Sequence, residues 1–231
     1  MASKRSRTPE SEYEQAIQPY VPVIKRAESL AVKCTNRNSP VVVFAHGAGA
    51  PSTSEWMIRW KNLLASALNA VEVVTFNYPY INGRRKAAPK PEKLVGFHCD
   101  IVRKVAAKYP EHPLILAGKS MGSSCCLLGY PLKATNGVIR DELLLQLTVP
   151  IMFVQGGNDG FCPLESLEMV RKKLKAINAL HVIANGDHSF QIAKKNLELT
   201  GMTHEEAEER AVEAVALFIS QITSKKKVSV Q

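Results

Sequence analysis

Short apolar runs alternate with longer amphipathic stretches along residues 40–222. Runs that are apolar throughout are typical of strands buried on both faces of a parallel sheet, and amphipathic stretches between them are typical of covering helices. We expect strands at 40–45, 71–76, 113–117, 151–154 and 180–184, and helices at 55–68, 93–109, 163–177 and 204–222. The pattern predicts an α/β protein with a three-layer, doubly wound, mostly parallel sheet.

The chain length of 231 residues fits a single α/β domain. We predict that this domain covers residues 21–223, with a disordered basic tail at 1–20 and a second basic tail at 224–231. No run reaches the roughly 18 consecutive apolar residues that span a bilayer, and the charged first ten residues precede no apolar run. We therefore expect neither a membrane segment nor a secretory signal.

The formal net charge of +9 is concentrated near the chain ends. Residues 1–10 carry a net +2 and the lysines at 225–227 add +3, which leaves +4 for the rest of the chain. Because charged tails are usually solvated, this distribution argues against a nucleic-acid partner.

The cysteines are odd in number and scattered along the chain. They are Cys34, Cys99, Cys125, Cys126 and Cys162. This arrangement predicts buried thiols in a reducing compartment, the cytosol or the nucleus, rather than a disulfide framework. The absence of a C-x-x-C pair or a Cys/His cluster predicts no metal site.

A G-x-S-x-G sequence follows the expected strand at 113–117. It consists of Gly118, Lys119, Ser120, Met121 and Gly122. In a sharp strand-to-turn context this motif strains the serine backbone and pushes its hydroxyl out at the edge of the sheet. Ser120 is therefore the candidate nucleophile.

Two further strand ends supply the partners that a serine nucleophile needs, a base and a carboxylate that orients it. Asp159 follows the strand at 151–154, and His188 follows the strand at 180–184. His98 and His181 lie inside an expected helix and strand and are weaker candidates. We expect Asp187 to shape the turn beside His188.

A fourth strand end is rich in glycine. Residues 46–50 read His-Gly-Ala-Gly-Ala directly after the first strand. The backbone of such a loop can donate hydrogen bonds to the oxyanion of a tetrahedral intermediate. We expect the oxyanion site to contain the N–H groups of Met121 and Ala48, with Gly47 beside them.

A basic loop at residues 82–91 follows the second strand. In this fold class ligands bind beyond the carboxyl ends of the strands, so Arg84 and Arg85 would lie on the rim of the same cleft. They would attract anionic substrates, although an exposed loop of this composition is also typical of plain solvated surface.

The strand-end motifs together resemble the α/β-hydrolase superfamily. Its members carry the triad in the chain order Ser, Asp, His, as found here. Tyr78-Pro79-Tyr80, Leu128–Leu132 and Gly186–Phe190 make the sequence most similar to the α/β-hydrolase-like domain of the testis-expressed and NSL-complex regulatory subunit type. The resemblance implies the α/β-hydrolase fold; some such domains are non-catalytic subunits of larger complexes.

The segment after Ser120 departs from this family. Only residues 121–124 separate the serine from the apolar run 125–128, whereas parallel neighbours usually need a crossover of about a dozen residues or more. Either the run is a helix and one strand is missing, or it is a strand and the helix after the serine is missing.

Two functions are compatible with these features. The first is a serine esterase or acyl-hydrolase that uses Ser120, His188 and Asp159, needs no cofactor, and acts on a small acyl ester. The second is a catalytically impaired hydrolase-fold module that binds protein partners.

Overall fold

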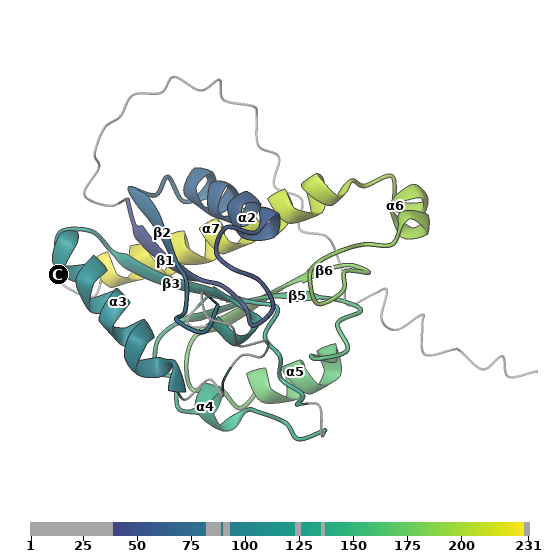
Figure 1. Ribbon diagram of the computed structural model, residues 1–231. Coiled ribbons are helices and arrows are strands. Elements are labelled where there is room, and N and C mark those ends of the chain that lie inside the picture. The colour runs from purple at the N-terminus through teal and green to yellow at the C-terminus, as the bar shows by residue number, and fades with distance from the viewer. Residues whose placement is uncertain (1–38, 82–88, 90–92, 123–125, 135–136, 229–231) are drawn as a thin grey trace, which may run out of the picture. The chain divides into compact units, whose positions relative to one another are not determined.

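A six-stranded sheet forms the centre of the structure (Figure 1). The computed structural model describes residues 39–81, 89, 93–122, 126–134 and 137–228. The strand order within these residues is β2-β1-β3-β4-β5-β6, and every neighbouring pair is parallel. The strands are β1 (Val41–Ala45), β2 (Glu72–Phe76), β3 (Leu114–Lys119), β4 (Cys126–Leu128), β5 (Ile151–Gly156) and β6 (Asn178–Ile183). The helices are α2 (Glu55–Ala67), α3 (Val95–Lys108), α4 (Glu142–Leu145), α5 (Leu164–Arg171), α6 (Lys194–Thr200) and α7 (His204–Val228), and a 3₁₀ helix, η2 (Ser120–Gly122), follows β3.

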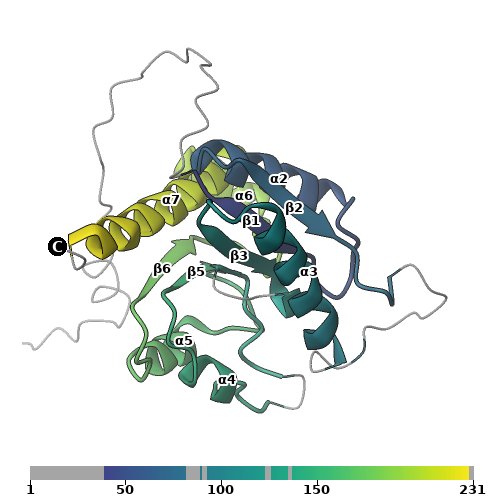
Figure 2. The ribbon, with the colours of Figure 1, turned by 90° about the vertical axis from the view of Figure 1, so that its left-hand side faces the viewer.

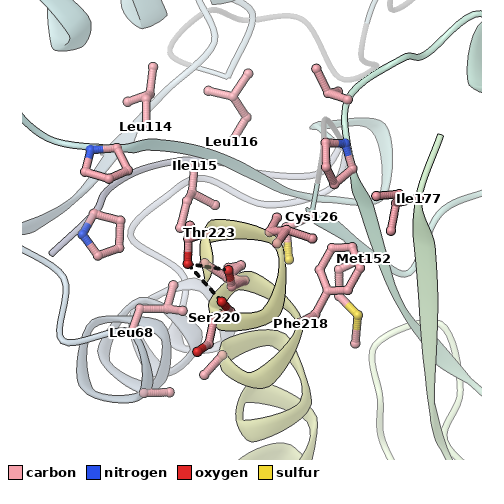
Figure 3. A pocket seen from close by; sticks show the side chains of 18 residues that line it. Leu68, Leu114, Ile115, Leu116, Cys126, Met152, Ile177, Phe218, Ser220 and Thr223 are labelled. Carbon is pink, nitrogen blue, oxygen red and sulfur yellow. Dashed lines mark hydrogen bonds between the residues drawn. The ribbon is translucent and has the colours of Figure 1, made fainter. Parts of the chain in front are cut away.

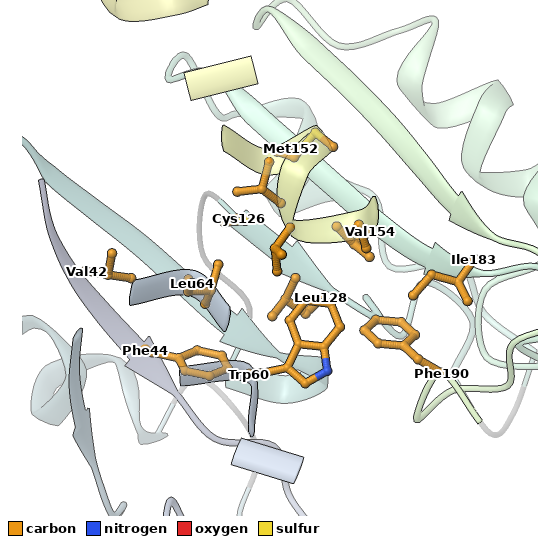
Figure 4. Close-up of a cluster of buried hydrophobic side chains, with 14 of the residues drawn as sticks. Val42, Phe44, Trp60, Leu64, Cys126, Leu128, Met152, Val154, Ile183 and Phe190 are labelled. Atoms are coloured by element: carbon orange, nitrogen blue, oxygen red, sulfur yellow. The ribbon is translucent and has the colours of Figure 1, made fainter. Parts of the chain in front are cut away.

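Alternate residues of β1 face opposite helical layers, as the period of a strand requires. Val42 and Phe44 pack with α2 and α7, whereas Val41 and Val43 pack with α3. Figure 2 shows α2 and α7 on one face of the sheet and α3 and α5 on the other. Trp60 of α2 is fully buried in the larger of these clusters (Figure 4). The predicted three-layer, doubly wound sheet is confirmed.

Glu208 ties α7 to α2. Its carboxylate accepts hydrogen bonds from Arg59 at 2.5 and 2.7 Å and from the Trp60 indole at 3.0 Å. The start of α7 is closed by reciprocal hydrogen bonds between Thr203 and Glu206, which form a capping box.

The connection from β3 to β4 decides between the two alternatives for the segment after Ser120. Residues 126–128 form a strand, and the three-residue η2 follows β3, so the second alternative holds, in which the helix after the serine is the missing element. The expectation that a parallel neighbour needs about a dozen connecting residues is wrong here, since β4 begins after residue 125. Cys126, the first residue of β4, pairs with Ala117, which lies two residues before the end of β3. The connection therefore has to move back along β3 by the length of only two residues before β4 begins.

Because β4 is short, an apolar cavity lies between β3 and β5 near the amino-terminal ends of these strands. Leu114–Leu116 of β3 pair with β1 but not with β4 in the described part of the chain. Side chains of β3, β4, β5 and α7, among them Leu116, Met152 and Phe218, line a cavity of about 860 Å³ there (Figure 3).

Some element boundaries differ from the sequence-based expectations. The helix predicted at 163–177 ends at Arg171, because Lys173 and Leu174 form i to i−3 hydrogen bonds that tighten its last turn. The last helix runs past residue 222 to Val228, and the short helices α4 and α6 were not predicted. None of the helices within the described ranges has the length and apolar character needed to cross a membrane.

The cysteine environments are mixed. Cys126 and Cys162 are buried, as predicted, but Cys99 is exposed on α3. Cys99 stands between His98 and Asp100 on the solvent side of the amphipathic α3.

Candidate active site

The structure brings Ser120, His188 and Asp159 together at the carboxyl ends of β3, β6 and β5. His188 Nε2 lies 3.0 Å from Ser120 Oγ, and His188 Nδ1 lies 2.7 Å from Asp159 Oδ2. The three side chains therefore form a continuous line of hydrogen bonds, in which the imidazole bridges hydroxyl and carboxylate.

The Asp159 carboxylate is fully buried beneath the imidazole. Burial raises the pKa of this carboxyl, but hydrogen bonding to His188, the N–H of Phe161 and the Gln155 amide outweighs burial and holds the pKa below its usual value. The group is thus an anion next to His188 Nδ1. The aromatic ring of Phe161 meets the imidazole edge-on at 4.9 Å between centroids and limits its movement.

Ser120 lies in a strained turn. Its φ is +52°, a left-handed conformation that costs free energy for any residue with a Cβ. Gly122 makes this turn possible, because a Cβ at that position would lie 2.5 Å from the carbonyl oxygen of His46. The turn packs against the end of β1 and lifts the Ser120 hydroxyl toward His188.

The buried side chain of His46 holds the glycine-rich loop after β1 in place. The buried imidazole accepts a hydrogen bond from the Tyr78 N–H at Nε2, at 3.0 Å, and its Nδ1 lies 2.6 Å from the carbonyl oxygen of Gly47. Since Nε2 accepts, Nδ1 carries the proton and donates. Burial lowers the pKa of His46, which favours this neutral form.

Tyr80 fixes the orientation of the loop's peptide groups. Its hydroxyl lies 3.2 Å from the carbonyl oxygens of both Gly47 and Ala48. In a planar trans peptide the N–H points opposite to the C=O. The N–H groups of Ala48 and Gly49 are therefore directed away from Tyr80.

Lys119 is a buried cation beside the same site. Its ammonium group donates to the main-chain carbonyl of His188 and lies over the rings of Trp56 and Phe190, 5.1 and 4.7 Å from their centroids. Burial lowers the pKa of Lys119 to about 8, although Asp159 and Asp187 oppose the shift. Gly129 leaves room for the Lys119 side chain, because a Cβ at this position would lie 2.8 Å from Lys119 Nζ.

A cavity of about 700 Å³ opens over Ser120 and His188. Gly47, Ala48 and Met121, the residues expected at an oxyanion site, all line it. Arg84 and Arg85, the expected rim residues, lie outside the described residues. Within the described ranges, no group of three His, Cys, Asp or Glu side chains is arranged to hold a metal ion.

The neighbouring histidines and acids have structural contacts. Asp187 accepts hydrogen bonds from the N–H groups of Ser189 and Gln191 and so shapes the turn, as predicted. His98 is bonded to the Tyr78 hydroxyl, and His181 lies within β6.

The sequence analysis missed Lys119, Tyr80, His46 and Phe161. Lys119 stands inside the G-x-S-x-G motif and Phe161 stands two residues after Asp159, so proximity in sequence could have pointed to both. Nothing in the sequence shows that Tyr80 reaches the glycine-rich loop, because that contact depends on how β2 and β1 are paired.

Residues 38–220 match the model of the alpha/beta hydrolase domain family. The chain belongs to the α/β-hydrolase family. The match covers all six strands and the site at their carboxyl ends.

Solved structures of low sequence identity share this fold. An alpha-beta serine hydrolase homologue from Coxiella burnetii is 17% identical, with a TM-score of 0.56 over 77% of this chain and 85% of that one. An esterase from Pyrococcus furiosus is 16% identical, with a TM-score of 0.57 over 80% and 85%. A serine hydrolase without lid from Xanthomonas campestris is also 16% identical, with a TM-score of 0.50 over 77% and 83%.

Proposed function

We propose that this α/β-hydrolase is a serine hydrolase that cleaves carboxylic esters. The observation that carries this proposal is the unbroken line of hydrogen bonds from Asp159 through His188 to the Ser120 hydroxyl. A serine hydroxyl at neutral pH becomes a useful nucleophile only when a base is within reach of its proton. The names of the structural neighbours, a serine hydrolase and an esterase, point the same way.

The reaction has two halves. Ser120 Oγ attacks the acyl carbonyl carbon while its proton passes to His188 Nε2. The ester C–O bond then breaks, His188 returns the proton to the leaving alkoxide, and an acyl-serine forms. Water repeats the sequence: its proton goes to His188, its oxygen bonds to the acyl carbon, and Ser120 leaves with the proton, which releases the acid. The Asp159 anion orients the imidazole and stabilises its protonated form.

The developing oxyanion would be stabilised by backbone N–H groups. Ala48 and Met121 are the donors expected from the sequence, and the hydrogen bonds of Tyr80 to the carbonyls of Gly47 and Ala48 add Gly49 to the candidates. One such donor is worth about 3 kcal/mol in studied enzymes. No organic cofactor or metal enters this scheme.

A fluorophosphonate probe tests the proposal, because it reacts covalently with an activated serine and releases fluoride. We expect the wild-type protein to be labelled and Ser120→Ala to remain unlabelled, with parallel loss of 4-nitrophenyl acetate hydrolysis. Ser66→Ala, an exposed serine on α2, is the matched control and should react like the wild type. Equal labelling of wild type and Ser120→Ala would overturn the proposal.

A second candidate is a hydrolase-fold interaction module. The specific observation in its favour is the short connection after Ser120, since no long helix begins there to direct its positive N-terminus at the oxyanion. The narrower resemblance to the testis-expressed and NSL-complex regulatory subunit type also supports it. A folded wild-type protein that neither takes up the probe nor hydrolyses esters would favour this candidate. A cytosolic or nuclear location stays a prediction under both.

A further inference from the structure

Two basic side chains from one hairpin line the cavity over Ser120 and His188. They are Lys133 and Arg140, from the segment that follows β4. Residues 133 and 139 form an antiparallel bridge, and the Arg140 N–H donates to the carbonyl of Leu132 at 2.8 Å. The hairpin backbone thus fixes where both side chains start, although their ends are exposed.

The hairpin is anchored to the catalytic histidine. The N–H of Lys133 donates to the carbonyl of Phe161 at 2.7 Å, and the Phe161 ring packs on the His188 imidazole. On the other side, the Tyr130 hydroxyl donates to the carbonyl of Arg140 at 2.9 Å. The backbone positions from which the two side chains extend are therefore fixed relative to His188.

No carboxylate in the described part of the chain forms an ion pair with them. Of the described residues that line this cavity, none is Asp or Glu. The described ion pairs include neither Lys133 nor Arg140. Asp159 is occupied by His188, and Asp187 by the backbone of its own turn. The Lys and Arg side chains among the described lining residues, Lys119, Lys133 and Arg140, are thus not matched by any carboxylate in the same lining.

We propose that this cavity selects acyl esters that carry a second, anionic group, and that Lys133 and Arg140 are the specificity-determining residues. The inference rests on the proposed esterase function and assigns it a substrate class. Two like charges at the wall of a cleft raise the local concentration of anions and attract them more strongly than they would in open water. An anionic group distal to the scissile bond, a carboxylate or a phosphate, would meet the two cations while the ester lies at Ser120.

A matched pair of substrates measures the preference. 4-Nitrophenyl hydrogen adipate carries a free carboxylate, and its methyl ester is the neutral counterpart. We expect kcat/KM for the anionic ester to exceed that for the neutral ester by at least about tenfold at low ionic strength, and salt to reduce the ratio because it screens exposed charges.

The double variant Lys133→Gln/Arg140→Gln should lower this ratio at least severalfold, with Lys119 left as the remaining basic residue in the lining. Lys172→Gln/Lys173→Gln removes the same charge beyond the end of α5, away from the site, and should leave the ratio as in the wild type. A wild-type ratio near one, or an undiminished ratio in the double variant, would overturn the inference.

A binding measurement separates this inference from the proposed catalysis. N-(4-nitrophenyl)adipamate and its methyl ester have an amide in place of the scissile ester, and their affinities for the Ser120→Ala protein can be compared by calorimetry. Tighter binding of the anionic amide that depends on Lys133 and Arg140 supports the inference even if no ester is hydrolysed. Equal binding of the two amides contradicts it, whereas hydrolysis that does not require Ser120 contradicts only the proposed function.

Discussion

The ammonium group of Lys119 donates a hydrogen bond to the main-chain carbonyl of His188. Lys119 directly precedes Ser120, so a single side chain links the strand that presents the hydroxyl to the loop that presents the imidazole. Trp56 and Phe190 enclose this link, and the Trp56 indole also donates to the carbonyl of Ser189 at 3.0 Å. The relative positions of Ser120 and His188 are thus set by contacts outside the line of hydrogen bonds from Ser120 to Asp159.

Lys119→Met should lower kcat about tenfold with little change in KM. Methionine can occupy the space between the two aromatic rings, but it leaves the His188 carbonyl without its donor, and a hydrogen bond to a charged group contributes about 1.5–3 kcal/mol. Steady-state kinetics with 4-nitrophenyl acetate measure the effect. Lys172→Met, at an exposed lysine, is the control, and an unchanged kcat in Lys119→Met would show that the link does not position His188.

Tyr80→Phe should also lower kcat about tenfold, through the glycine-rich loop. The change removes one hydroxyl that bonds two carbonyls and thereby frees the peptide groups of Ala48 and Gly49 to rotate. Pre-steady-state measurement of acyl-enzyme formation should locate the loss in the acylation step. Tyr109→Phe removes a hydroxyl that bonds Glu72 on another part of the molecule, and it should leave acylation at the wild-type rate.

Much of this site followed from one rule, that parallel strands bring their carboxyl ends to a common edge. The positions of Ser120, Asp159 and His188 directly after strands were enough to expect them to meet. Tyr80 could not be found in this way, because its role depends on the direction of two carbonyl groups rather than on its place in the chain.

The fold was predictable where the apolar pattern was long. β1 and β5 are buried on both faces, and continuous apolar runs identify such strands. β4 has three residues, too few for any periodicity, and its apolar run is equally compatible with a helix. Only its pairing with β3 and β5 distinguishes a strand from a helix there.

Acidification below about pH 6.5 should destabilise the protein. Burial lowers the pKa values of His46, His98 and His181 below those of the unfolded chain, so the unfolded state binds more protons as the pH falls through this range. Their contribution to stability is complete above pH 6.5 and is lost as the pH drops toward the folded-state values. Each histidine can add up to about 1.4 kcal/mol per pH unit to the slope.

Urea unfolding at pH 7.5 and pH 5.5 measures this loss, and His46→Gln should make it smaller. Glutamine can replace one hydrogen bond of the imidazole and does not titrate, so the variant should be less stable at pH 7.5 but less sensitive to acid. His112→Gln, at the histidine before β3 whose ring is bonded to the Ser39 carbonyl, is the control. A slope that is the same in His46→Gln and the wild type would contradict the assignment of His46 as a buried neutral imidazole.

Replacing Glu208 alone should lower the free energy of unfolding more than replacing Arg59 and Glu208 together. The Glu208 side chain is 3% exposed and accepts from both Arg59 and the Trp60 indole, so Glu208→Leu leaves a cation and an indole N–H without their acceptor. We expect this variant to lose about 2 kcal/mol of unfolding free energy, because the Trp60 indole N–H is left without an acceptor and the Arg59 guanidinium, 39% exposed, loses a charged partner but stays partly hydrated. Arg59→Met/Glu208→Leu should recover much of the loss, since apolar side chains then join α2 to α7. Chemical unfolding of the two variants decides the point: a double variant no more stable than Glu208→Leu would mean that the bond to Trp60, and not the ion pair, holds the two helices together.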